Sequence, residues 1–233
     1  MSKKTIEQDE VIGMMSELFD ALNDAQQREL KRHIKVRSFK KNEYFYNEGD
    51  MPDTLFCLLQ GKIKISKEGV GGRHQIMRVA GAVEYFGYRA ALAGEPFITS
   101  ASAFESCLVA TMPLKLIKGY MQDNPQVGIF FVQRLAMALG QSDERTVNLT
   151  QKHMSGRLAE SLIFLRDNYG LEEDGCTLSL YLSREDLANL SSMTTANAIR
   201  TLSSFAREKI VAIDGKKIKL INMHALEEIN RLG

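Results

Sequence analysis

The spacing of apolar residues changes character along the chain, and each change indicates a different set of elements. Over the first forty residues, Leu18, Leu22, Leu30 and Ile34 recur at helical separations, and Asn23 is suited to cap a second helix. From Phe39 the pattern becomes short apolar alternations separated by glycine and proline, which is typical of antiparallel strands joined by turns. Because this style ends near residue 115, the sequence predicts a β-rich domain there.

A long helix from Gln126 to His153 is predicted next, because no proline and only two glycines interrupt this segment after the "DNP" at 123–125. Its positions at alternating separations of three and four residues have the spacing of a coiled-coil seam. They are Val132, Leu135, Leu139, Ser142, Thr146 and Leu149. A helix lying on its own domain would also show such a stripe. The polar Ser142 and Asp143 favour a helix that pairs with its twin beside a ligand or solvent pocket. The predicted dimer residues are Val132, Leu135, Leu139, Thr146 and Leu149.

The last third of the chain predicts a winged helix-turn-helix. It reads as a helix from about Gly156 to Asn168, an acidic loop containing Glu172 and Asp174, and a strand "TLSLYL". Two short helices in "SREDLANLSSMTTANAIRTLSSF" and a hairpin "KIVAIDGKKIKLI" follow. The expected fold is therefore α+β, with a β-roll domain at 1–122, a dimerisation helix and hinge at 123–153, and a DNA-binding domain at 154–233.

The two short helices carry the candidate chemistry. Ser183 and Asp186 form a capping-box pattern at the start of the first helix, whose leucines face an apolar stripe on the second helix. In a helix-turn-helix the start of the second helix enters the DNA major groove. Arginine suits guanine, asparagine suits adenine and an apolar tip suits the thymine methyl, so Arg200, Asn197 and Ile199 are candidate readers. The predicted DNA-binding residues are Ser183, Arg184, Thr194, Thr195, Asn197, Ile199, Arg200, Lys216 and Lys217.

Composition changes this picture in two ways. The net charge of the 233-residue chain is only +1, so a nucleic-acid footprint must be local. It lies between Thr194 and Leu220, where six basic residues face only Glu208 and Asp214. There is no apolar run long enough to span a membrane and no apolar core of a secretory signal near the N-terminus, so we expect a cytoplasmic protein without a membrane partner.

The order of these elements and several motifs resemble the cyclic AMP receptor and fumarate-nitrate regulator (CRP/FNR) family of bacterial transcription factors. The motifs are "NEGDMPDTLFCLLQGKIKI", "RLAESLIFL", "LSREDLANLSSMTTANAIRTLSSF" and "DGKKIKLI". The resemblance covers nearly the whole chain from about Leu18. It implies a homodimer, an effector cavity inside the β-roll, binding to a two-fold symmetric operator, and contact with RNA polymerase if the protein is an activator.

The sequence departs from the family at the effector site. Cyclic-nucleotide binders carry a cassette like F-G-E-L-A followed by an arginine, whereas this chain has "FGYRAALAGEPFITSAS", with Tyr88 in place of the glutamate. No lysine or arginine lies between Ala90 and Leu114 to neutralise a buried phosphodiester, so cyclic AMP is not the expected effector. Arg89 is an alternative anchor. The predicted effector-pocket residues are Phe86, Gly87, Tyr88, Arg89, Thr99, Ser100, Ser142 and Asp143.

The residues of the chain also bear on other cofactors and functions. An iron-sulfur cluster needs about four thiolates, and this chain has three dispersed cysteines. Haem stays open, with His33, His74 or Tyr88 as conceivable ligands. Many family members also carry a glutamate that reads cytosine where this chain has Ala196. The operator of this protein should therefore differ from the common family sequence. A module that controls a partner protein without binding DNA is the alternative function; no phosphate loop, HExxH or G-x-S-x-G motif indicates an enzyme.

Overall fold

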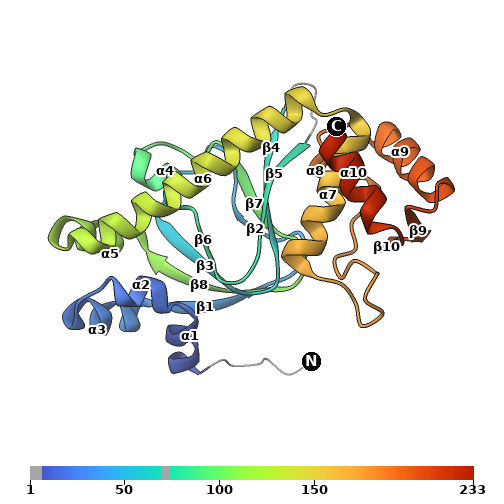
Figure 1. Ribbon diagram of the computed structural model, residues 1–233. Helices are drawn as coiled ribbons and strands as arrows, with labels where there is room; N and C mark the ends of the chain where they lie inside the picture. Colours follow the sequence, from blue (N-terminus) through green and yellow to red (C-terminus); the bar gives the residue numbers. More distant parts are fainter. Residues whose placement is uncertain (1–6, 70–73) are drawn as a thin grey trace. The chain divides into compact units, whose positions relative to one another are not determined.

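The computed structural model describes residues 7–69 and 74–233, which fall into two compact units. The first comprises Arg78–Gly140 with the described part of Met1–Lys67, and the second comprises Gln141–Gly233 with the described part of Glu68–Met77. Figure 1 shows their elements along the chain. Within the described ranges, no helix is both long and apolar enough to cross a membrane.

The strands of the β-roll form two four-stranded sheets, ordered β1-β8-β3-β6 and β2-β7-β4-β5. Their bounds are β1 (Lys35–Phe39), β2 (Tyr44–Tyr46), β3 (Thr54–Gln60), β4 (Ile63–Glu68), β5 (His74–Ala80), β6 (Glu84–Phe86), β7 (Ser100–Ala103) and β8 (Cys107–Pro113). The helices of this region are α1 (Gln8–Met14), α2 (Ser16–Asp20), α3 (Asp24–His33), α4 (Tyr88–Ala93) and α5 (Leu114–Asp123). This arrangement confirms the predicted α+β fold with an antiparallel roll (Figure 1).

Strand β3 explains how the roll is built. Its side chains alternate between two apolar clusters, because successive residues of a strand point to opposite faces. Phe56 and Leu58 join the cluster shared by the two sheets, whereas Leu55, Cys57 and Leu59 join the cluster formed with the helices. A strand that is covered on both faces needs an almost continuous apolar run, which "TLFCLL" supplies.

Helix α6 (Pro125–Gln151) matches the predicted long helix to within two residues at each end. It starts with proline at its first position, where no backbone donor is needed, and the Asn124 side chain accepts from the Gln126 amide at 3.1 Å. Val127, Phe130 and Phe131 bury the first turns in the apolar core of the first unit. This packing anchors the beginning of α6 and leaves other faces of the helix exposed.

The second unit has the predicted winged helix-turn-helix. Its elements are α7 (Met154–Tyr169), α8 (Arg184–Leu190), α9 (Thr195–Arg207), β9 (Val211–Asp214), β10 (Lys217–Leu220) and α10 (Met223–Leu232). The strand predicted for "TLSLYL" is wrong. Leu178, Leu180 and Leu182 are buried in alternation, but the segment forms only isolated bridges, such as Thr177 with Lys219, because no strand of the described ranges lies alongside its full length. Helix α10 lies beyond the elements that the sequence predicted.

Candidate nucleic-acid interface

The two short helices, α8 and α9, begin at capped residues. The Ser183 hydroxyl accepts from the Asp186 amide at 3.0 Å, which is the forward half of the predicted capping box. At the start of α9 the Thr194 hydroxyl accepts from the Asn197 amide at 3.3 Å. Both caps satisfy backbone donors that would otherwise lack partners, so the sequence itself sets where each helix begins.

The turn between α8 and α9 is tight because its serines take specialised roles. Ser192 adopts a φ of +55°, a left-handed conformation that reverses the chain within few residues. Ser191 is buried, and its hydroxyl contacts the Leu187 carbonyl and the Ser161 hydroxyl, both at 2.9 Å. The serine pair that interrupts the apolar pattern therefore forms the connection itself and secures it to α7.

The apolar face of α9 packs inward as predicted. Ala198, Leu202 and Phe205 are buried together with Leu187 and Ala188 of α8. The opposite face is exposed, and it includes Thr195, Ile199 and Arg200, which the sequence predicted to bind DNA. Thr195, Ala196, Arg200 and Ser203 are exposed, as is Ile199 at 44%, whereas Asn197 is half-buried. An exposed row at the start of the second helix of a helix-turn-helix is positioned to meet base edges.

Arg200 and Asn197 contact one another on this face. One guanidinium nitrogen of Arg200 donates to the Asn197 side-chain oxygen at 2.5 Å. The two residues lie three positions apart, a separation that brings side chains together on a helix surface. Sequence analysis predicted that each residue contacts its own base. The hydrogen bond between them is evident only from the side-chain conformations in the structure.

The hairpin of β9 and β10 forms the wing. Asp214 pairs with Lys217 across a tight turn, and Gly215 takes a φ of +55° that glycine adopts at little cost. The Gly215 carbonyl accepts from Nη2 of Arg184 at 2.7 Å, which ties the wing to the start of α8. Nη1 of Arg184 is buried without a hydrogen-bond partner among the described residues.

The acidic loop that contains Glu172 and Asp174 neutralises part of the positive charge of the wing, which sequence analysis did not predict. Lys217 pairs with Glu172 at 3.4 Å and lies over the Tyr181 ring, and Lys219 pairs with Asp174 at 3.2 Å. Hydrogen bonds from the Thr177 side chain and from nearby backbone amides, together with Lys219, hold the pKa of Asp174 well below its usual range. The local positive charge is therefore smaller than the residue count implied, and Lys216 lies exposed at the turn.

The residues predicted for the dimer seam differ in their surroundings on α6. Val132 and Leu139 are 62% and 63% exposed, and Leu149 is 38% exposed. Thr146 is exposed as well. Leu135 is half-buried against the core of the first unit. The outward face follows a heptad spacing through Ile129, Val132, Ala136, Leu139, Asp143, Thr146 and Thr150.

Most of the predicted effector residues lie around α4 and the neighbouring strands. Phe86 is buried and stacks on Phe56 with ring centroids 4.9 Å apart. Gly87 has a φ of +87°, and a Cβ there would lie 3.1 Å from the Phe56 ring. Tyr88 is buried beside Phe131, and Arg89 is exposed. Ser142 and Asp143 are exposed on α6 in the second unit.

A polar group around Tyr46 adds residues that the sequence did not single out. Burial raises the pKa of the Tyr46 hydroxyl, opposed by a hydrogen bond with Thr99 and by the charges of Arg78 and Arg89. Arg78 also pairs with Glu84 at 3.6 Å. Strand alternation could have revealed Arg78, because it shares a face of β5 with the buried Ile76. The Ser100 hydroxyl accepts from the Glu48 amide nearby.

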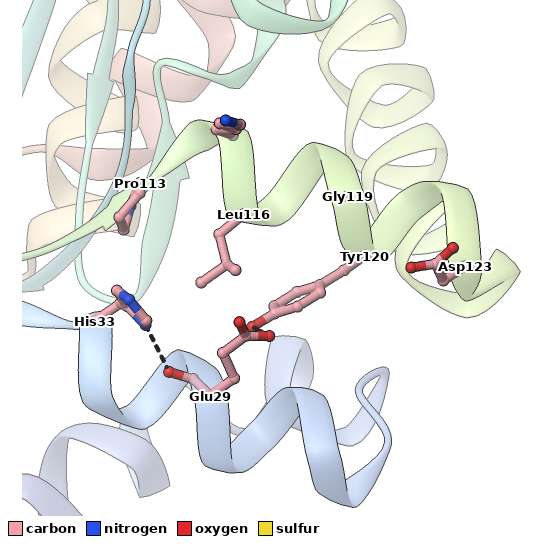
Figure 2. Close-up of a pocket in the computed structure, with 8 residues that line it drawn as sticks. Glu29, His33, Pro113, Leu116, Gly119, Tyr120 and Asp123 are labelled. Atoms are coloured by element: carbon pink, nitrogen blue, oxygen red, sulfur yellow. Dashed lines mark hydrogen bonds between the residues drawn. The ribbon is translucent and has the colours of Figure 1, made fainter.

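Two surface pockets lie in the first unit, and Tyr46 lines the second of them. One of about 370 Å³ runs between α3 and α5, where the Tyr120 hydroxyl donates to Glu29 at 3.0 Å and His33 closes one end (Figure 2). The other, of about 360 Å³, is lined by Phe45, Tyr46, Asp50, Met51, Asp53, Thr54, Phe56 and Phe97. Neither is lined by a predicted effector residue. Among the described residues, no group of three or more His, Cys, Asp and Glu side chains is placed to hold a metal.

The capped helix pair, the exposed face of α9 and the wing define a DNA-binding transcription regulator of the helix-turn-helix class. Residues 36–124 match the cyclic nucleotide-binding domain family, and residues 156–229 match the Crp-like helix-turn-helix domain family. The chain belongs to the CRP/FNR family. This family consists of transcription regulators, so the expectation that the chain is not an enzyme holds.

Three relatives illustrate the likeness. The CRP-like cAMP-activated global transcriptional regulator of Mycobacterium tuberculosis is 21% identical, over 94% of this chain and 97% of its own length. The global nitrogen regulator of a Nostoc species is 24% identical over 78% of this chain and 83% of its own length. The solved structure of a CRP/FNR-family regulator from Eubacterium rectale has a TM-score of 0.80 at 19% identity, covering 92% of this chain and 97% of that one.

Proposed function

We propose that the protein acts as a homodimer on a two-fold symmetric operator, with α9 of each copy in the major groove. The observation that carries this proposal is the exposed face of α9, which begins at a capped residue and carries Arg200 and Ile199 outward. The family match to the helix-turn-helix domain favours this function over control of a partner protein without DNA.

Dimerisation through α6 accounts for its exposed apolar side chains. Val132 and Leu139 lie outward on one face and are more than half exposed. Pairing with a second helix would remove this apolar surface from water. Leu135 contributes less to such a seam, because it packs against the core of its own chain. Two copies joined in this way would present two α9 helices to two half-sites, as the symmetry of an operator requires.

Within each copy, reading and anchoring belong to different residues. Arg200, Ile199, Thr195 and Asn197 face base edges in this arrangement, whereas Lys216 at the wing tip meets the phosphate backbone. Ser183 and Thr194 serve the interface mainly as helix caps. Lys217 is already paired with Glu172 and contributes less charge to DNA than Lys216 does.

The proposed effector is a small molecule other than cyclic AMP, bound in the β-roll near Phe86, Gly87, Tyr88 and Thr99. Tyr88 is buried where a cyclic-nucleotide cassette carries glutamate, and no lysine or arginine lies between Ala90 and Leu114. Arg78 comes from a different strand and is paired with Glu84, so its charge is partly neutralised. These residues therefore offer a different arrangement of charge from the one that a cyclic phosphodiester needs.

The proposal places the protein in the cytoplasm of a bacterium, where promoter DNA lies, and gives RNA polymerase as a further partner if the protein activates transcription. Native mass spectrometry of the purified chain should give a mass of about twice 26.2 kDa. Calorimetric titration with cyclic AMP should show no binding at micromolar concentration. A monomeric mass would contradict the dimer, and micromolar binding would contradict the effector assignment.

A further inference from the structure

The bond between Arg200 and Asn197 fixes how the asparagine amide is turned. A guanidinium nitrogen can only donate a hydrogen bond, so the atom of Asn197 that faces it is the carbonyl oxygen, at 2.5 Å. The amide nitrogen of Asn197 therefore points away from Arg200. The Asn197 backbone amide is itself held by the Thr194 cap, so this residue sits at a defined place in the first turn of α9.

We infer that Asn197 is a positioning residue for Arg200 and that the two side chains read DNA as one unit, in which Arg200 engages the Asn197 oxygen and hydrogen-bond donors face the base edges. This inference rests on the proposed function of α9 in the major groove. Asparagine recognises adenine by accepting from N6 and donating to N7 at once. Here the accepting oxygen already holds a charged donor, which an adenine would have to displace or share.

The remaining donors of the pair favour a different base pattern. Nη2 of Arg200 carries a second hydrogen besides the one donated to Asn197, and together with Nη1 or Nε it can match the O6 and N7 acceptors of guanine. Nδ2 of Asn197 matches an acceptor on the adjacent base pair, such as thymine O4 or a purine N7. The pair should therefore select guanine next to a base that presents an acceptor. It should not read adenine in the two-bond manner that an isolated asparagine would use.

A neutral amide suits this role better than a carboxylate. Asn197 restricts the rotamers of Arg200 before DNA binds, which reduces the ordering cost of binding, and it adds no negative charge near the phosphates. The neighbouring Ala196 has no polar atom that could compete for the guanidinium. Arg200 thus keeps its full charge for the groove while one of its nitrogens is held in place.

The experiment measures affinities for a selected operator and for its single-base variants. The variants are Asn197→Ala, Arg200→Ala, their double mutant, and Ser203→Ala as an exposed control on the same helix. Arg200→Ala should reduce discrimination at one guanine about ten- to hundredfold. Asn197→Ala should reduce discrimination at that same guanine several-fold, and the double mutant should resemble Arg200→Ala there, because the two residues act as a unit. Ser203→Ala should leave it unchanged.

A rescue variant separates positioning from a general structural effect. Asn197→Asp keeps an acceptor for Arg200, so it should retain discrimination at that guanine while it weakens binding to all duplexes through its added charge. Replacing that guanine with 7-deazaguanine should abolish the difference between wild type and Asn197→Ala. If Asn197→Ala changes preference only at a separate adenine, with additive effects, the residues are independent readers and the inference is wrong although the proposed function stands. If the wild-type protein prefers no duplex sequence, the inference and the proposed function are both wrong.

Discussion

At the scale of single residues, Lys216 and its neighbour Lys217 are adjacent in sequence but differ in their surroundings. Lys217 pairs with Glu172 and lies over the Tyr181 ring, whereas Lys216 is exposed at the wing tip. Each lysine that contacts a DNA phosphate releases counterions from the DNA. Each such contact therefore steepens the slope of log binding constant against log salt concentration by nearly one unit. Lys216, which is exposed and can reach the DNA backbone, should therefore give this effect in full, whereas Lys217 should not.

We therefore predict that Lys216→Ala weakens binding to all duplex sequences alike and lowers the salt slope by about 0.9. Lys217→Ala should change the slope less, because its charge is already paired within the unit. The measurement is fluorescence anisotropy of a labelled duplex over a salt series. A Lys216→Ala protein that changes base preference instead would show that the wing tip reads sequence.

At the scale of elements, the start of α9 depends on the Thr194 cap. Its hydroxyl satisfies the Asn197 amide, and removing such a cap costs about 1 kcal/mol of stability. Thr194→Ala should lower the free energy of unfolding by this amount in chemical denaturation. Thr195→Ala, one residue later and exposed, is the matched control and should change it little. Equal losses in both variants would show that the cap does not determine the stability of the helix.

The same elements show how far sequence reasoning reaches. Apolar spacing predicted the β-roll, α6, the pair α8 and α9, and the wing, because each buries a periodic face. It misplaced the strand at 177–182, since buried alternation does not reveal whether a partner strand lies alongside. The candidate site was predicted as a set of residue types. The bond of Arg200 to Asn197 and the pairing of Lys217 with Glu172 depend on rotamers and long-range contacts, which periodicity does not encode.

At the scale of the whole molecule, the exposed face of α6 is expected to be covered by a second copy. We predict that the double variant Val132→Asp with Leu139→Asp is monomeric in sedimentation equilibrium, because two carboxylates would be buried in the seam. Met137→Asp is the control. Met137 is 67% exposed but lies on a different side of the helix, so this variant should stay dimeric. Dimers in the double variant would remove α6 from the interface.

The central claim is that two copies of α9 read a two-fold symmetric operator. Selection of bound duplexes from a random pool tests it most directly, with wild type and Arg200→Ala run in parallel. The account predicts an inverted repeat whose half-sites are centred about 10 base pairs apart, or a multiple of that, and loss of one guanine preference in both halves with Arg200→Ala. Enrichment of a single unrepeated motif, or of no sequence at all, would contradict the account.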